Sequence, residues 1–209
     1  IGLAMARDAD PFTYAGAVTY GYAAGIGAGV QRSCDSAVRE IENAQHVAER
    51  SGNDFAVAHV GATLGVALVH RPAAAERARG ERLLTEVQEV FLNQGHHLGD
   101  LPIVTVYLAR EGARRGERDE ALSLMRCALD DLIRRGQLLG TGITATGVLV
   151  ETLLQRAAPG DLVEAEAAIE RLAAAATDYR AAVREVWLLR MRALLAQARG
   201  ESQNYVRYR

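Results

Sequence analysis

Gly116-Glu117-Arg118-Asp119-Glu120-Ala121 is the stretch that decides the fold, because it joins the end of one predicted helix to the start of the next. Gly116 suits the left-handed residue that follows a helix. Beyond it, Ala121, Met125 and Ala128 are spaced so that they share one face of a helix. Ala109 lies twelve residues before Ala121, where a small side chain lets two antiparallel helices pack closely. The stretch therefore predicts a helical hairpin.

The same register recurs along the chain. Its anchors are small residues, each followed four residues later by a larger apolar residue and seven residues later by another core residue: Ala37, Gly80, Ala121 and Ala165. Successive anchors are 43, 41 and 44 residues apart. A bundle without repeats has no reason to keep such a period, so the spacing favours a stack of similar hairpins.

Alanine-rich segments divided by glycines predict an all-α fold with little strand. The predicted helices cover 13–28, 33–51, 54–70, 74–94, 101–115, 118–135, 142–157, 161–175, 180–199 and a last one from 202. They pair into hairpins at 13–51, 54–94, 101–135, 142–175 and 180–209. We expect a single repeat domain over 1–209 that is a piece of a longer protein.

These hairpins resemble the tetratricopeptide (TPR) repeat. The Gly turn, the Asp-Glu-Ala start of the second helix and the pair of small residues are those of that family. Two positions depart from it, because Gly112 replaces the aromatic residue late in the first helix and Ile133 replaces the closing proline. The period also exceeds the 34 residues of a standard TPR. The resemblance implies a TPR-like α-solenoid of about four complete helical pairs and a truncated fifth.

Composition excludes several functions. All 24 basic residues are arginine, so chemistry that needs a lysine, such as that of a P-loop or a Schiff base, is absent from this chain. A net charge of -2 and a pI near 6.3 give no reason to expect nucleic acid as a partner. No stretch reaches the roughly 20 uninterrupted apolar residues that are needed to span a bilayer. The N-terminal residues also lack the basic region followed by an apolar run that is typical of a signal peptide. We expect a cytoplasmic protein that does not contact a membrane.

No residue group predicts a cofactor, a metal or a catalytic site. Cys34 and Cys127 lie far apart in helical segments, which favours two small core residues over a disulfide or a zinc cluster. His96 and His97, with Asp100 nearby, are the only concentration of metal-ligand side chains, and a solvated loop is the better interpretation because no standard zinc spacing accompanies them.

The candidate binding residues are Tyr107, Arg110, Trp187 and Arg190. If the first helix of each pair lines a concave groove, these side chains could project into it and recognise an acidic or aromatic-contacting partner. The alternative is that Tyr107 and Trp187 belong to the core. Helix 180–199 also carries more apolar residues than one core-facing stripe supplies, which predicts a homodimer or marginal solubility.

At a finer level, five stretches resemble the C-terminal helical region of large actinobacterial signalling proteins, in which a class III adenylate cyclase domain precedes a signal-transduction ATPase and TPR-like repeats. These stretches are 100–110, 134–139, 145–154, 165–172 and 187–196. They are packing patterns, so no catalytic residue of that family carries over to this chain.

The resemblance implies a non-catalytic regulatory, sensor or protein-interaction module in cAMP signalling. Any cyclase activity of the parent protein would belong to a domain outside this chain. The implied partners are another protein, upstream domains of the same chain or a small-molecule effector. The alternative is the effector-binding arm of an ATP-dependent LuxR-type transcription regulator, whose helical tail is similar.

Overall fold

A computed structural model describes residues 10–94, 100–175 and 181–208, and all the regular structure in these residues is helical. The predicted all-α fold is confirmed. The predicted helix limits lie within two residues of the observed ones, except that the predicted helix 13–28 is divided into an α-helix (Pro11–Val18), a π-helical turn (Thr19–Ala23) and a short α-helix (Ala24–Gly27). The residues that follow each repeat anchor at the predicted spacing are buried, as are the anchors themselves: Ala37, Ile41, Ala44, Gly80, Leu84, Val87, Ala121, Met125, Ala128, Ala165, Ile169 and Leu172. The detailed correspondence to TPR packing stays a prediction.

The chain forms two compact units, Ile1–Val104 and Thr105–Arg209. The first contains α2 (Pro11–Val18), a π-helical turn η1 (Thr19–Ala23), α3 (Ala24–Gly27), α4 (Asp35–Ser51), α5 (Asp54–Val69) and α6 (Ala74–Gln94). Helix α7 (Leu101–Arg115) begins in the first unit and continues in the second. The second unit contains α8 (Arg118–Arg134), α9 (Thr141–Arg156), α10 (Asp161–Ala174), α11 (Ala181–Ala198) and α12 (Ser202–Tyr208).

Helix ends follow from local sequence. The Asp10 side chain caps α2 by accepting hydrogen bonds from the backbone N–H groups of Phe12 and Thr13. Asn53 caps α5 in the same way through the N–H of Ala56. At the other ends, Gly52 and Gly116 have φ angles of 65° and 105°, a region in which a side chain is strained. The glycines therefore end helices where the sequence predicts.

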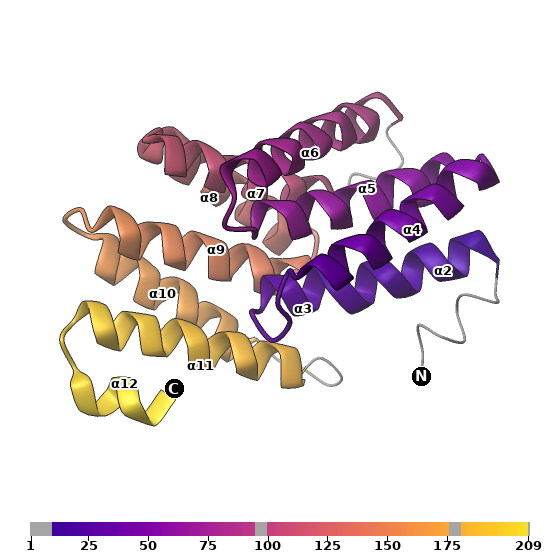
Figure 1. The fold of residues 1–209 in the computed structure, drawn as a ribbon. Helices are drawn as coiled ribbons and strands as arrows, with labels where there is room; N and C mark the ends of the chain where they lie inside the picture. The colour runs from indigo at the N-terminus through magenta and orange to yellow at the C-terminus, as the bar shows by residue number, and fades with distance from the viewer. Residues whose placement is uncertain (1–9, 95–99, 176–180, 209) are drawn as a thin grey trace. The chain divides into compact units, whose positions relative to one another are not determined.

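In the first unit, α5 packs against α2, α4 and α6 (Figure 1). Its neighbours on several sides explain why apolar residues surround this helix rather than forming one stripe. The contact with α6 is close at Gly65 and Gly80. A Cβ added at Gly80 would lie 2.8 Å from the carbonyl oxygen of Gly65, so the two backbones touch there. Gly80 is thus the small anchor that this crossing requires.

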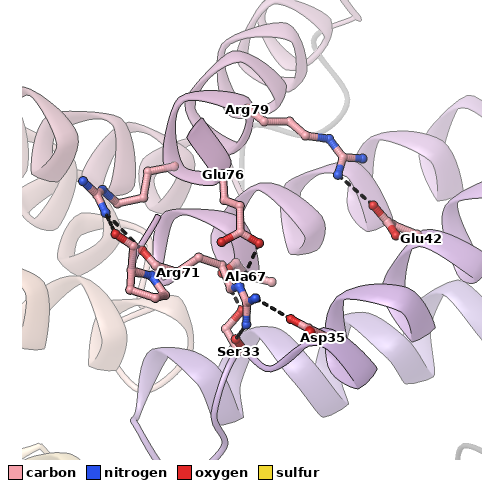
Figure 2. A network of polar contacts seen from close by, with 9 residues as sticks. Ser33, Asp35, Glu42, Ala67, Arg71, Glu76 and Arg79 are labelled. Carbon is pink, nitrogen blue, oxygen red and sulfur yellow. Dashed lines mark hydrogen bonds and ion pairs between the residues drawn. The ribbon is translucent and has the colours of Figure 1, made fainter. Parts of the chain in front are cut away.

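Arg71, just after α5, ties three segments of the first unit together (Figure 2). Its guanidinium donates hydrogen bonds to the backbone carbonyl of Ser33, to Asp35 at the start of α4 and to Glu76 in the first turn of α6. Ser33 in turn donates to the carbonyl of Ala67 at 2.6 Å. The connection between α3 and α4 is therefore fixed to the end of α5.

In the second unit, α9 occupies the central position, packing against α8, α10 and α11. Helix α11 also contacts α10 and α12. The first helices of three successive predicted hairpins are α7, α9 and α11. The side chains proposed above as a binding site come from two of them.

Candidate functional site

The second unit brings the four candidate residues into one cluster with a fifth. Tyr107 and Arg110 come from α7, and Trp187 and Arg190 come from α11. Each pair is an aromatic residue followed three positions later by an arginine, the spacing at which side chains on a helix meet. The Arg110 guanidinium carbon lies 5.1 Å from the Tyr107 ring centroid, and that of Arg190 lies 5.4 Å from the Trp187 ring. Both are cation–π distances.

Glu151 on α9 joins the two pairs. One of its carboxylate oxygens, Oε1, lies 2.7 Å from Nη2 of Arg190. The charge of Glu151 also acts on Tyr107 and on Arg110. The carboxylate therefore pairs with Arg190 on α11 and lies close enough to Arg110 on α7 to act on its charge, so the cluster extends over α7, α9 and α11.

Trp187 fits into a gap in α9. A Cβ added at Gly147 would lie 1.9 Å from Cζ3 of the Trp187 ring, well inside any carbon–carbon contact. The ring thus lies directly on the α9 backbone, and only glycine leaves room for it. Trp187 is 1% exposed, and its indole nitrogen Nε1 has no hydrogen-bond partner.

Burial sets the electrostatics of the cluster. It raises the pKa of Tyr107 to about 12, with Glu151 adding to the rise and the two arginines opposing it. Burial likewise lowers the pKa of Arg110, against the attraction of Tyr107 and of two glutamates, including Glu111 at 3.7 Å. Arginine nevertheless keeps its proton in proteins. Tyr107 and Arg110 are therefore protonated at neutral pH.

This chemistry suits charge recognition better than catalysis. The raised pKa of Tyr107 keeps its phenol protonated near pH 7, where a neutral phenol is a poor nucleophile and a poor general base. An arginine held against a carboxylate can instead respond to a competing anion, because the two acids would share one guanidinium. Arg190 is the accessible end, with 39% of its side chain exposed, whereas Glu151 is largely covered.

The sequence alone found part of this site. Tyr107, Arg110, Trp187 and Arg190 do meet, but Tyr107 and Trp187 are each 1% exposed, so their rings pack between helices and do not line an open surface. Their role in binding stays a prediction. Glu151 was missed, although a signal existed, since it is the one charged residue in 141–155 of an otherwise apolar and neutral polar helix.

Two other sequence interpretations have different outcomes. His96 and His97 lie outside the described residues. Asp100 lies within them, and its carboxylate is 2.8 Å from Nε2 of His59 on α5. The prediction that Cys34 and Cys127 are core residues is wrong, because both are exposed. Cys34 is the residue immediately before α4, and Cys127 lies on the solvent-exposed face of α8.

Searches of the described residues found no group of three or more His, Cys, Asp or Glu side chains placed to hold a metal ion. They also found no helix with the length and apolar content needed to cross a membrane. No family model, no curated protein and no solved structure matches the chain.

Proposed function

We propose that this chain is a non-catalytic regulatory module that passes the binding of a protein or small effector to other domains of a signalling protein. The observation that carries the proposal is the cluster on α7, α9 and α11, in which an accessible arginine, Arg190, neutralises a covered carboxylate, Glu151. An anionic group that draws Arg190 outward leaves Glu151 without that charge. Removing one partner from a largely covered ion pair is costly, and a rearrangement of the helices would relieve that cost.

The packing of Trp187 supports the same idea. Its ring is fixed on Gly147, and Arg190 lies over the ring one helical turn further on. A displacement of Arg190 therefore acts on the contact that joins α9 to α11. A regulatory module needs a contact between elements that can adopt two arrangements in order to connect a binding event to a distant domain, and we propose the α9–α11 contact for that role.

The type of signalling protein rests on the sequence resemblance to adenylate cyclase–ATPase fusions with TPR-like tails. In such a protein the partner would be an upstream domain of the same chain, another protein or a small effector, and the output would be the rate of cAMP formation. The catalytic residues would belong to the cyclase domain, with none supplied by this chain.

The test replaces Arg190 with glutamine in the full-length protein that contains this chain, and measures its cAMP output with and without its activating conditions. Because glutamine leaves Glu151 without the charge of Arg190, we expect basal output to shift toward that under activating conditions and the response to those conditions to shrink. The control is Arg192→Gln on the same helix, which removes a surface pair with Glu170 at 3.3 Å and leaves the cluster intact.

A second arm deletes residues 105–209 in the full-length protein. A response identical to that of the parent protein, after either the deletion or Arg190→Gln, would refute the proposal. Absence of any cAMP output, together with retention of the protein on double-stranded DNA, would favour the transcription-regulator alternative.

A further inference from the structure

Arginines recur near the ends of the odd-numbered helices α5, α7, α9 and α11. They are Arg71, Arg114, Arg156 and Arg199, at intervals of 43, 42 and 43 residues. This interval agrees with that of the small-residue anchors, which lie in the second helix of each hairpin, whereas the arginines lie at the end of the first. A repeated charged position needs a repeated partner, and the structure supplies one in each unit.

In the first unit, Arg71 binds Asp35 at the start of the preceding even-numbered helix, α4, and Glu76 in the first turn of the following one, α6 (Figure 2). In the second unit, Arg156 binds Asp119 and Asp161, at the starts of α8 and α10. Asp161 is 1% exposed and also accepts the backbone N–H of Ala158 at 2.8 Å.

The sequence spacings of the two networks agree. Asp35 precedes Arg71 by 36 residues and Asp119 precedes Arg156 by 37, while each arginine precedes its second acid by five. The corresponding residues of the two units are therefore offset by 84 residues in the first helix and by 85 in the later ones. The small-residue anchors give the same values, since Ala37 and Ala121 differ by 84 and Gly80 and Ala165 by 85.

A second ion pair joins α4 to α6 in the first unit and α8 to α10 in the second, and the positions of its acid and its arginine are exchanged between the two units. In the first unit, Glu42 on α4 accepts a hydrogen bond from Arg79 on α6 at 2.7 Å. In the second, Arg126 on α8 donates to both carboxylate oxygens of Glu164 on α10, at 2.6 and 2.7 Å. By the same offsets of 84 and 85, Arg126 corresponds to Glu42 and Glu164 to Arg79.

We propose that α4–α5–α6 and α8–α9–α10 are two copies of one three-helix unit, and that the exchanged bridge determines which outer helices pair. The bridge that both copies share, at Arg71 and Arg156, cannot discriminate between them. The exchanged bridge can, because α4 against α10 would oppose Glu42 to Glu164, and α8 against α6 would oppose Arg126 to Arg79. Like charges placed across a helix pair disfavour the wrong partner.

This device protects a repetitive chain from its characteristic error. Copies with the same core pattern can exchange helices within one chain or between chains, which gives misfolded or domain-swapped products. Exposed ion pairs contribute little to stability. Their value here lies in the difference between correct and incorrect pairings, and the forked guanidinium of Arg126 adds geometric selectivity that a lysine would lack.

The test uses the full chain and four proteins: the parent, Arg126→Glu, the reversed pair R126E/E164R, and the fourfold variant R126E/E164R/E42R/R79E. The single reversal opposes two glutamates, so we expect the equilibrium constant for unfolding in urea to rise roughly two- to fivefold. The reversed pair should restore the parent value. Without that restoration, the bridge does not form and the proposal fails.

The second measurement addresses pairing. Each protein is unfolded, refolded at high concentration and analysed for dimer by light scattering after size-exclusion chromatography. R126E/E164R places a glutamate on the first outer helix and an arginine on the second in both three-helix units. Wrong pairings then no longer oppose like charges, so we expect a larger dimer fraction than in the parent. The fourfold variant makes the polarities opposite again and should return to the parent fraction. Equal dimer fractions in the parent, the reversed pair and the fourfold variant would overturn the proposal.

Discussion

Replacing Gly147 with alanine tests how tightly α9 and α11 pack. The new Cβ would lie 1.9 Å from Cζ3, 2.3 Å from Cε3 and 2.5 Å from Cη2 of Trp187. Carbon atoms prefer separations of about 3.5–4.0 Å, so the ring has to move by roughly 1.6 Å or more. Overpacking of this kind costs about 1–3 kcal/mol, and displacement of a whole ring belongs near the upper value.

Helix propensity acts in the opposite direction. Alanine is more favourable than glycine inside a helix by about 1 kcal/mol. We therefore expect Gly147→Ala to lower the free energy of unfolding by about 2 kcal/mol. In a Trp187→Ala background the steric partner is absent, so the same substitution should raise the free energy of unfolding by up to about 1 kcal/mol.

Urea denaturation of the four proteins in this double-mutant cycle, followed by circular dichroism, measures both changes. Gly16→Ala is the matched control, because a Cβ added at Gly16 in α2 meets nothing within 4 Å. That variant should be stabilised whatever residue 187 is. The reasoning is refuted if Gly147→Ala is neutral or stabilising in the parent, or equally destabilising when Trp187 is removed.

Three further predictions concern titrating groups. Burial raises the pKa of Tyr107 to about 12, so the unfolded chain loses the phenol proton at lower pH than the folded protein does, and stability falls between about pH 10 and 12. In urea titrations, Tyr107→Phe should remove up to about 2.7 kcal/mol of that fall. A hydrogen bond from Ser36 lowers the pKa of the exposed Cys34 thiol, so iodoacetamide should alkylate Cys34 faster than the exposed Cys127. Peptide mass spectrometry measures both rates, and equal rates would contradict the prediction. The Arg156 guanidinium at the end of α9 lowers the pKa of Asp161, so the ionised carboxylate stabilises the fold above about pH 4 and this stabilisation is lost on acidification. Asp161→Asn should therefore reduce the loss of stability at low pH in urea titrations, and an unchanged loss would contradict the prediction.

The repeat was visible in the sequence because core positions leave a strong pattern. Ala37, Ala121 and Ala165 are buried small residues at a regular interval, so their spacing reports the repeat directly. Gly80 gives the same signal, and the structure explains why it has no side chain at all. Turn glycines such as Gly116 give the helix ends, since few other residues adopt a positive φ easily.

The candidate site was harder to predict because burial depends on neighbours that are distant in sequence. A tyrosine or tryptophan followed three residues later by an arginine looks the same whether it faces a groove or a core. For Trp187, the deciding residue is Gly147, forty positions earlier on another helix. The exposure of Cys34 and Cys127 was misjudged for the same reason, since an amphipathic pattern does not fix the face of one small residue.

What the sequence determined by itself was the local and periodic part of this protein: all-α structure, helix limits within two residues, the hairpin repeat and the absence of lysine chemistry. These depend on backbone preferences and on spacing along the chain. Only the tertiary structure decided which charges meet. The bridges of Arg71 and Arg156, the exchanged pairs and the contact of Arg190 with Glu151 join residues five to 39 positions apart, and an arginine can reach many acids until folding fixes its surroundings.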